Sequence, residues 1–449
     1  MSSVCYANYR ESGIEWLGEV PAHWLATQVR RLFKIEKRIS GELGYDVLSI
    51  TQRGIKVRDV DSNDGQLSMD YAKYQFVYPG DFAMNHMDLL TGYVDLSTQL
   101  GVTSPDYRVF RPRNKQYISS RYYLYIFQMC YLDKIFYPLG QGASLFGRWR
   151  LPTDAFNEFC VPLPPPSEQA EIAAFLDRET AKIDALVEEQ RRLIALLAEK
   201  RQAVISHAVT KGLDPTVPMK DSGVEWLGEV PAHWKVMPIR RLLSGITQGW
   251  SPECLGRPAD GQEWGVLKAG CVNGGIFNPE ENKSLPATLE PRPEYEVQPG
   301  DILMSRASGS PALVGACAFV NKTRPRLLMS DKIYRIRLLP DCDPEWFSIL
   351  MSAGMMRAQI VSAISGAEGL ANNLPQSSLK GFQCAVPPQD EQLELVQYVK
   401  IVIERLAALI SEAEGAITLL QERRAALISA AVTGKIDVRG LVPAVEEAA

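Results

Sequence analysis

SGIEWLGEVPAHW at residues 12–24 returns as SGVEWLGEVPAHW at residues 222–234, and the single difference is Ile14 against Val224. EKRQAVISHAVTKGLD at 199–214 and ERRAALISAAVTGKID at 422–437 form a second related pair. The stretches between these copies are much less alike. The chain is therefore a twofold internal repeat with shared ends and divergent middles. We expect such a chain to hold one kind of platform twice and to read two different things with it.

Composition places the chain among globular proteins. Its 449 residues suffice for two or more domains, and 46% of them are hydrophobic while 22% are charged. No secretory h-region is visible at the N-terminus, and no apolar run approaches the roughly 18 residues of a membrane span, which predicts a cytoplasmic protein. The eight cysteines form no C-x-x-C motif and have no histidines at zinc spacing. We therefore expect reduced, structural thiols and no metal site.

The formal net charge of −5 argues weakly against nucleic acid binding. Its distribution along the chain is uneven, however, because both middles carry a slight excess of basic residues and the remainder is acidic. This charge distribution permits DNA binding without predicting it.

The two middles, residues 25–162 and 235–385, are rich in short β-like runs separated by Gly, Pro, Asn and Asp. Both contain Pro-Gly-Asp, at 79–81 and 299–301, ahead of an apolar run, which predicts a turn that leads into a strand. Each middle is expected to be a mixed α+β domain.

A long helix is predicted after each middle, beginning near PLPPPSEQ at 162–169 and AVPPQDEQ at 385–392, where Ser167 or Asp390 can cap the first turn. Apolar residues recur every seven positions, as in a coiled-coil seam. About 40 residues at 1.5 Å each give a rod of about 60 Å, and two related rods would pack antiparallel. The alternative is that each helix packs on its own domain. The predicted seam comprises Leu176, Ile183, Gln190, Leu197 and Val204, with Ile172, Leu186, Leu193, Val187 and Ile194 beside them, and in the second helix Val399, Leu406, Ala413, Leu420 and Leu427, flanked by Leu395, Val402, Leu409 and Ala416.

Motifs of a self-contained enzyme are missing from the sequence. It has no G-x-G-x-x-G, no phosphate loop and no Asn/Asp-Pro-Pro-aromatic motif of amino-methyltransferases. Asp260, Glu281 and Lys283 could be fitted to a nuclease-like pattern but are more typical of a polar loop. His23 and His233 belong to the repeated segment, where a role in fixing a turn between two tryptophans is favoured over catalysis.

Taken together, the segment S-G-[IV]-E-W-L-G-E-V-P-A-H-W before each middle, the [LV]-P-P…E-Q after it and a long helix ending in A-V-T resemble the specificity subunit of type I restriction–modification systems. The resemblance covers nearly the whole chain. It extends into the first middle at GDFAMNHMD (80–88) and GVTSPDYRVFRP (101–112), and into the second at SGITQGWSPEC (244–254), WGVLKAGCVNGGIFNPEENKSLP (264–286) and SDKIYRIRL (330–338). One departure is SRASGSP at 305–311, where Ser308 stands in place of the usual Asn.

The resemblance implies an α+β fold in which two target-recognition domains of mixed α/β structure are joined by two long antiparallel coiled-coil helices with an internal pseudo-twofold repeat. Each domain would read one half of a bipartite double-stranded DNA target, and the helices would set the spacer and dock two modification subunits. Those partners would supply S-adenosylmethionine and adenine methylation, and restriction subunits would add ATP- and Mg-dependent translocation and cleavage. The chain itself would hold no cofactor and catalyse nothing.

On this basis the chain divides into seven segments: 1–24, the first repeat segment; 25–162, recognition domain 1; 163–214, spacer helix 1; 215–234, a linker with the second repeat segment; 235–385, recognition domain 2; 386–437, spacer helix 2; and 438–449, a tail.

Candidate DNA-binding residues are polar and basic side chains on loops, because base edges are read by such groups and phosphates are held by cations. In the first domain these are Thr51, Gln52, Arg53, Lys56, Asn85, His86, Gln141, Ser144, Arg148 and Arg150, and in the second Gln248, Trp250, Lys268, Asn273, Arg306, Lys332, Asn372 and Asn373. Two other functions stay open. One is a coiled-coil scaffold that positions two modules on something other than DNA, and the other is a stand-alone DNA-modifying enzyme.

Overall fold

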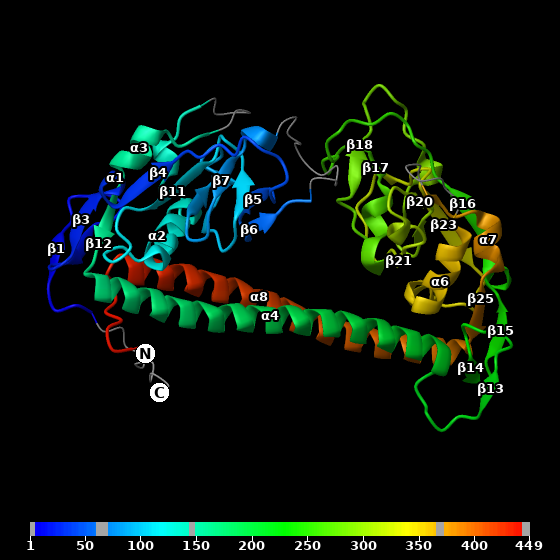
Figure 1. Ribbon diagram of the computed structural model, residues 1–449. Coiled ribbons are helices and arrows are strands. Elements are labelled where there is room, and N and C mark those ends of the chain that lie inside the picture. Colours follow the sequence, from blue (N-terminus) through cyan, green and yellow to red (C-terminus); the bar gives the residue numbers. More distant parts are fainter. Residues whose placement is uncertain (1–4, 60–70, 143–148, 365–371, 442–449) are drawn as a thin grey trace. The chain divides into compact units, whose positions relative to one another are not determined.

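The computed structural model of the protein describes residues 5–59, 71–142, 149–364 and 372–441. It divides into two compact units. Unit 1 combines Met1–Gln190 with Gly415–Ala449, and unit 2 is the continuous stretch Arg191–Glu414. The division crosses both long helices, so each unit contains a part of each of them (Figure 1). Unit 1 is therefore built from two distant parts of the sequence.

Unit 1 is centred on a four-stranded antiparallel sheet covered by the buried helix α2 (Ser120–Leu132). The sheet order is β4 (Phe33–Glu36), β11 (Arg108–Pro112), β8 (Phe82–Met84) and β9 (Val94–Leu96). The other elements are the hairpin β1 (Tyr9–Glu11) and β2 (Glu19–Pro21), the pair β3 (Leu25–Gln28) and β12 (Cys160–Leu163), the hairpin β5 (Leu48–Thr51) and β6 (Gly54–Val57), the pair β7 (Gln75–Val77) and β10 (Gly101–Thr103), the helices α1 (Val29–Leu32) and α3 (Thr153–Glu158), and the 3-10 turns η1 (Tyr71–Lys73) and η2 (Tyr137–Leu139).

Unit 2 is centred on an equivalent antiparallel sheet, in the order β16 (Leu243–Gln248), β23 (Ile333–Leu338), β19 (Ile302–Ser305) and β21 (Cys317–Phe319). Its other elements are the hairpin β13 (Met219–Asp221) and β14 (Glu229–Pro231), the pair β15 (Lys235–Pro238) and β25 (Gln383–Val386), the sheet of β17 (Gly265–Leu267), β18 (Asn282–Ser284) and β22 (Leu327–Leu328), the pair β20 (Ala307–Ser308) and β24 (Asn372–Asn373), the helices α5 (Pro344–Ser352), α6 (Gly354–Ala363) and α7 (Gln376–Gly381), and the 3-10 turns η3 (Ile239–Arg241), η4 (Ala269–Gly275), η5 (Pro293–Tyr295) and η6 (Pro311–Leu313).

The two central sheets share one topology although their sequences differ. In both, the strand that comes first in the chain pairs with the last, and the last pairs with the second, which pairs with the third. The flanking pairs correspond as well, since β1–β2 matches β13–β14 and β3–β12 matches β15–β25. The internal repeat therefore extends through the divergent middles.

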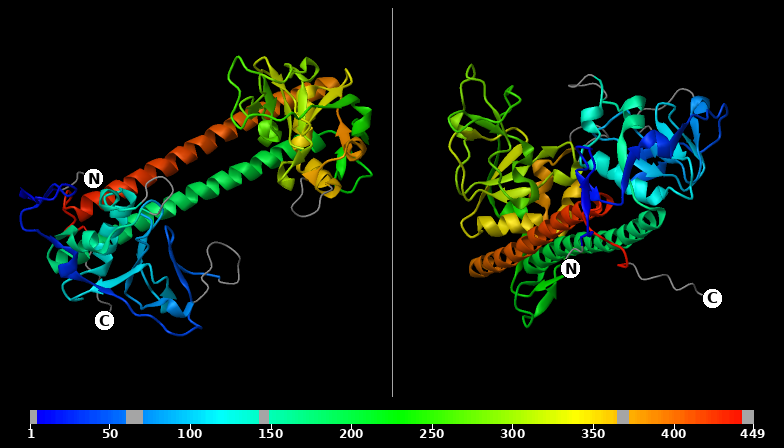
Figure 2. Two further views of the ribbon diagram at one scale, coloured as in Figure 1. Left: turned by 90° about the horizontal axis from the view of Figure 1, so that it is seen from above. Right: turned by 90° about the vertical axis from the view of Figure 1, so that its left-hand side faces the viewer.

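The long helices are α4 (Pro166–Lys211) and α8 (Gln389–Val432), of 46 and 44 residues, each about 65–70 Å long at 1.5 Å per residue. They lie side by side and run antiparallel (Figures 1 and 2). In unit 1 the Asp184 carboxylate accepts from the Arg424 guanidinium at 2.9 Å. In unit 2 the chain at Gly212, just after α4, lies against Glu391 at the start of α8. The predicted antiparallel coiled coil is confirmed.

The seam between the helices is narrower than the sequence predicts. Leu176, Ile183, Leu406 and other predicted seam residues are buried, but Leu186, Leu193 and Leu409 are 45%, 42% and 48% exposed. These three leucines belong to the row expected beside the seam, and along this stretch the partner helix covers only the seam itself.

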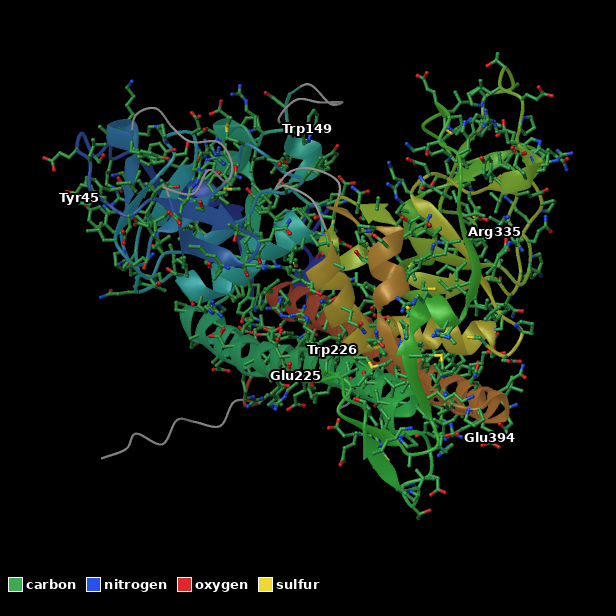
Figure 3. All side chains as sticks on the ribbon, turned by 90° about the vertical axis from the view of Figure 1, so that its right-hand side faces the viewer. Tyr45, Trp149, Glu225, Trp226, Arg335 and Glu394 are labelled. Carbon is green, nitrogen blue, oxygen red and sulfur yellow. The ribbon has the colours of Figure 1, made fainter. Side chains whose placement is uncertain are left out.

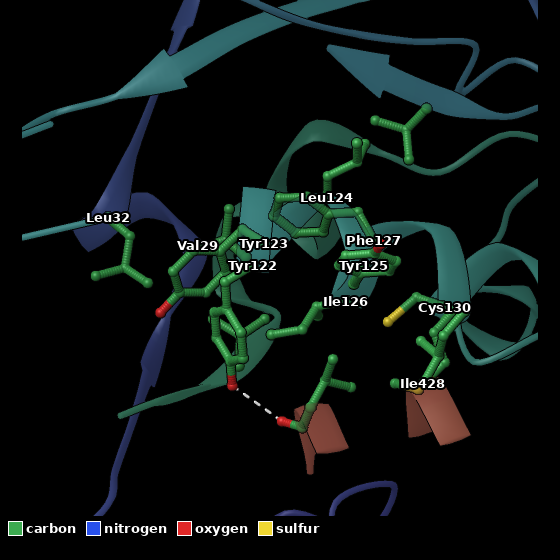
Figure 4. Packing of buried hydrophobic residues seen from close by; sticks show 14 of the residues in the cluster. Val29, Leu32, Tyr122, Tyr123, Leu124, Tyr125, Ile126, Phe127, Cys130 and Ile428 are labelled. Carbon is green, nitrogen blue, oxygen red and sulfur yellow. Dashed lines mark hydrogen bonds between the residues drawn. The ribbon is translucent and has the colours of Figure 1, made fainter. Parts of the chain in front are cut away.

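The core of unit 1 contains residues of the domain and of both long helices. The alternative, in which a long helix packs on a domain, therefore also holds in part. Tyr122, Tyr123 and Phe127 of α2 are buried together with Ile428 and Val432 of α8 (Figure 4). The Tyr122 hydroxyl donates to the Val432 carbonyl at 2.9 Å. α2 is buried almost all round, as expected for a helix with apolar residues on every face.

The repeated segment fastens each domain to the start of a long helix. His23 lies 2.9 Å from the Glu168 carboxylate, and His233 lies 2.9 Å from that of Glu391. These histidines thus have a structural role, as favoured from the sequence, although their partners are helix carboxylates. Ser167 and Asp390 lie within the first turns of α4 and α8 rather than before them, because the helices begin at Pro166 and Gln389.

The E-Q pair at the start of each helix has a second task. The Gln169 side chain accepts from the Ser119 backbone N–H at 2.9 Å, and Gln392 accepts from that of Asp343 at 2.8 Å. Ser119 and Asp343 are the N-caps of α2 and α5. In each pair the Glu therefore binds the histidine of the repeated segment. The Gln binds the N-cap of α2 in unit 1 and of α5 in unit 2.

All eight cysteines are unpaired. Within the described ranges, no group of His, Cys, Asp and Glu has the geometry of a metal site, and no helix there is long and apolar enough to cross a bilayer.

Candidate nucleic-acid interface

In unit 1, two loops meet at the end of the central sheet where β8 finishes. The Leu151 backbone N–H donates to the His86 carbonyl at 2.9 Å, and Gln141 and Arg150 pair through both backbone groups, at 2.8 and 3.0 Å. The candidates Asn85, His86, Gln141 and Arg150 are thus brought together. Ser144 and Arg148, which belong to the same loop, lie outside the described residues.

The β5–β6 hairpin carries four further candidates and lies beside β9. The Asp95 carboxylate in β9 accepts from the Ile55 backbone N–H at 3.1 Å, and Ile55 and Tyr93 pack against the same buried cluster. The Tyr93 backbone carbonyl in turn accepts from the Asn85 backbone N–H at 2.9 Å. The turn with Thr51, Gln52, Arg53 and Lys56 therefore projects next to the Asn85 loop.

The basic side chains of the β5–β6 hairpin and of the Arg150 loop could bind an anion such as a phosphate. Arg53, Lys56 and Arg150 are exposed, and none of them forms an ion pair with a carboxylate in the described ranges. His86 adds no charge at neutral pH, because burial, helped by the nearby Arg108 guanidinium, lowers the pKa of its imidazole to about 3.

Unit 2 repeats this geometry with different side chains. The Leu374 backbone N–H donates to the Arg306 carbonyl at 2.9 Å, and β24 places Asn372 and Asn373 opposite Ser308 and Ala307. The Arg306 N–H donates to the Lys332 carbonyl at 2.7 Å. Gln248 joins the group from the end of β16, where it pairs with Tyr334. Five candidates therefore gather at the end of the sheet that corresponds to the Asn85 end of unit 1.

In each unit a buried side chain, the anchor, bonds the loop at the sheet end, which contains Leu151 in unit 1 and Leu374 in unit 2. The Arg108 guanidinium donates to the Leu151 carbonyl at 3.0 Å, and the Tyr334 hydroxyl donates to the Leu374 carbonyl, also at 3.0 Å. Arg108 has no carboxylate partner in the described part of the chain and lies 4.5 Å from the Phe156 ring centre. Burial lowers the pKa of Arg108 to about 10, so it stays charged at neutral pH.

These two anchors were missed from the sequence because both lie inside apolar strands, in YRVFRP and KIYRIRL. For Arg108 the available signal was a cation within an otherwise buried run, since such a group needs hydrogen-bond acceptors in the interior. Tyr334 gave no such signal, because tyrosine is common in strands.

Three candidates of unit 2 lie apart from the group at the sheet end. Lys268 lies 3.5 Å from the Glu281 carboxylate, and Asn273 belongs to η4, whose Gly274 carbonyl accepts from Arg201 of α4 at 3.3 Å. The η4 turn with Asn273 thus contacts the long helix through its backbone, and Lys268 is held by Glu281. The Trp250 ring packs in a small apolar cluster, with the Arg292 guanidinium 4.7 Å from its centre.

The carboxylate pattern around Asp260 is structural. Its side chain accepts from the backbone N–H groups of Gln262 and Glu263 at 2.9 and 3.0 Å. Glu281, the second carboxylate, is held by Lys268. A polar turn explains both residues.

Comparison with known proteins identifies the relatives of this chain. Residues 60–194 match the family model described as type I restriction modification DNA specificity domain. The chain is 31% identical over 215 residues to the type I restriction enzyme EcoEI specificity subunit of Escherichia coli, covering 47% of this chain and 36% of that protein. It is 25% identical over 292 residues to the EcoKI specificity subunit of Escherichia coli strain K12, covering 63% and 59%. The match therefore spans about a third to three fifths of these relatives' own length.

The fold also has a solved counterpart, from a study of complex assembly and conformational transition of the type I R-M system. The likeness covers 92% of this chain and 98% of that chain, with a TM-score of 0.63 and 15% identity, and it concerns the fold alone. The resemblance and the fold class drawn from the sequence are both confirmed.

Proposed function

We propose that this chain is the DNA-specificity subunit of a type I restriction–modification complex, in which each unit reads one half of a bipartite double-stranded target. The observation that carries the proposal is that two equivalent sheets present different polar loops at equivalent ends, held there by Leu151 and Leu374. A duplicated platform with divergent contacts suits two half-sites of different sequence. The matched specificity-domain family supports DNA as the ligand over a scaffold for other modules.

The long helices have the attributes of a spacer and of a docking surface. Their paired length suits half-sites about one helical turn, roughly 34 Å, or more apart. The exposed leucines Leu186 and Leu409 are equivalent positions of the repeat, so each helix offers the same apolar position once. A partner present in two copies would cover both. We infer two modification subunits as these partners, joined by restriction subunits in a cytoplasmic complex.

The proposal assigns no catalytic step to this chain. Methyl transfer from S-adenosylmethionine would belong to the modification subunits, and ATP and Mg would be used by the restriction subunits. What this chain supplies is orientation, because its loops would fix which adenines are brought to the partner's site.

Calorimetry of the purified chain with S-adenosylmethionine is expected to give no binding heat, because no cofactor loop or methyltransferase tetrapeptide is present in the sequence. The matched measurement uses the complex with its modification subunits, which should bind the cofactor. Micromolar binding by the chain alone would contradict a non-catalytic role.

The anchor Tyr334 offers a sharper test of the reading loops. Tyr334→Phe removes one hydroxyl and leaves the buried Leu374 carbonyl without its donor, which is expected to cost about 1–3 kcal/mol. Because the loop with Asn372 and Asn373 starts from this anchor, base preference should relax in one half-site only.

Competition binding of the assembled methyltransferase to sets of single-base target variants measures this preference. Tyr295→Phe is the matched control, since no described residue accepts from the Tyr295 hydroxyl. Equal weakening at every base position would show that Tyr334 supports the fold without positioning the loop.

A further inference from the structure

Most identical positions of the repeated segment have a structural task. Leu17, Val20 and Trp24 are buried, and so are their counterparts Leu227, Val230 and Trp234. Gly13 and Gly18 have φ angles of 73° and 63°, which disfavour a side chain, and the same holds at 223 and 228. Packing and backbone conformation therefore explain why these positions match in both units.

Glu15 and Glu19 match Glu225 and Glu229 without such an explanation. The same holds for the exposed ring of Trp226, whereas its counterpart Trp16 packs on Phe159. The four glutamates are exposed, and no cation in the described ranges forms an ion pair with them. Trp226 is 52% exposed (Figure 3). Within the described ranges Trp226 belongs to no buried apolar cluster, and its indole N–H has no protein acceptor.

The ends of the long helices show that duplication alone does not preserve surface residues. Gln202 and His207 are exposed on α4, and their counterparts in α8 are Ala425 and Ala430. Surface positions on the helices have therefore diverged between the two copies. The glutamates and the tryptophan of the hairpin loops have stayed identical.

In unit 1 the equivalent tryptophan, Trp16, borders an apolar hollow. Trp16 stacks on Phe159 with an interplanar angle of 12° and donates to the Cys160 carbonyl at 3.2 Å. Next to it lies a hollow of about 850 Å³, lined by Ile135, Leu139 and other apolar groups, with Glu15 and Glu158 among its lining residues. The shape suits an apolar side chain flanked by cations.

Each hairpin also carries a like-charge pair across its strands. Glu11 stands opposite Glu19 in β1–β2, and Asp221 stands opposite Glu229 in β13–β14. Directly opposed like charges destabilise a two-stranded ribbon. The charge is kept in both copies although the residue differs, and a bound cation-rich surface would remove the repulsion.

We propose that the two hairpins are a duplicated docking surface for a protein that binds this chain twice, through a patch of basic and apolar residues. The tryptophans are the apolar anchors, and the carboxylates orient the partner. The inference rests on the proposed function in one respect, because it takes the modification subunit as the protein that binds twice.

The test uses the full chain with its modification subunit and counts bound subunits by mass photometry. Trp226→Ala together with Glu225→Lys is expected to weaken one of the two binding events by about thirtyfold, as for an interface anchor. Glu15→Lys with Glu19→Lys, which leaves the Trp16 packing in place, should weaken the other. All four substitutions together should leave no bound subunit at concentrations that saturate the wild-type chain.

Leu25→Ala is the matched control, because Leu25 is an exposed apolar residue next to the first segment and its counterpart is Lys235. It should leave two subunits bound. Two bound subunits of unchanged affinity in the four-substitution variant, with unchanged thermal unfolding, would overturn the inference and leave the proposed function intact. A wild-type chain that binds no modification subunit would overturn the proposed function itself.

Discussion

Replacing residues 25–162 with the equivalent region of another specificity subunit is expected to change one half of the DNA target and to leave the other half as it was. The structure gives the physical reason. Leu25 and Leu163 are paired across β3 and β12, so the region begins and ends on one two-stranded ribbon. The donor region must keep a tyrosine at the place of Tyr122, because its hydroxyl bonds the Val432 carbonyl of α8.

Methylome sequencing of cells that carry the exchanged chain reports both half-sites at once. The mirror exchange of residues 235–385 is the matched control and should change the opposite half. Single substitutions should follow the same division: Arg53→Ala in the first unit and Asn373→Ala in the second. Loss of a base contact costs about 1–3 kcal/mol at one base position, whereas loss of a phosphate contact weakens all sites alike. An effect of Arg53→Ala on the half-site of unit 2 would mean that the units do not read independently.

Adding one heptad to both long helices is expected to move the two half-sites further apart in the recognised sequence. Seven residues lengthen a helix by about 10 Å, or about three base pairs of B-DNA, and turn it by only about 20° from a 3.5-residue repeat. Insertion after Gln190 and after Glu414 follows the boundary of the units, so the contacts within each unit are preserved.

Inserting two residues at each of the same positions is the control. Two residues turn the helix by about 200° and would place the buried stripe with Ile183 and Leu406 on the wrong side of the pair. We expect this variant to lose assembly, while the heptad variant methylates a motif with a longer spacer. An unchanged spacer in the heptad variant would refute the role of the helices in setting the distance.

The sequence predicted the repeat, the two long helices and their antiparallel pairing because these depend on local periodicity and on visible identity. It could not predict that the divergent middles share a sheet order, since pairing such as β4 with β11 joins residues far apart in the chain. The seam was overestimated for a related reason: Leu186 and Leu193 have the right spacing, but spacing does not tell how wide a stripe the partner helix covers.

The positions of the candidate residues in the fold were predicted in part, and their contacts with DNA stay a prediction. Loop chemistry indicated Asn85, Gln141, Arg306 and Asn373, and the fold brings each of them to the end of a central sheet. Lys268 and Asn273 were selected by the same rule and lie apart from the sheet end, Lys268 against Glu281 and Asn273 in the η4 turn, because residue type does not reveal which end of a sheet a loop occupies. The partners of His23 and Arg108 depend on tertiary packing, so neither partner could be identified from the neighbouring sequence.

Unit 1 is assembled from the two ends of the chain, and this affects how it folds during synthesis on the ribosome. Unit 2 is continuous, and all its residues have been made once Glu414 is added. Unit 1 has its own strands early, but its core stays open until Ile428 and Val432 arrive. At about 5–20 residues per second the stretch from Leu163 to Val432 takes on the order of thirteen to fifty-four seconds. We therefore expect the nascent N-terminal domain to need protection by chaperones during that interval. A chain that ends before α8 should leave Tyr122 and its neighbours open to proteolysis.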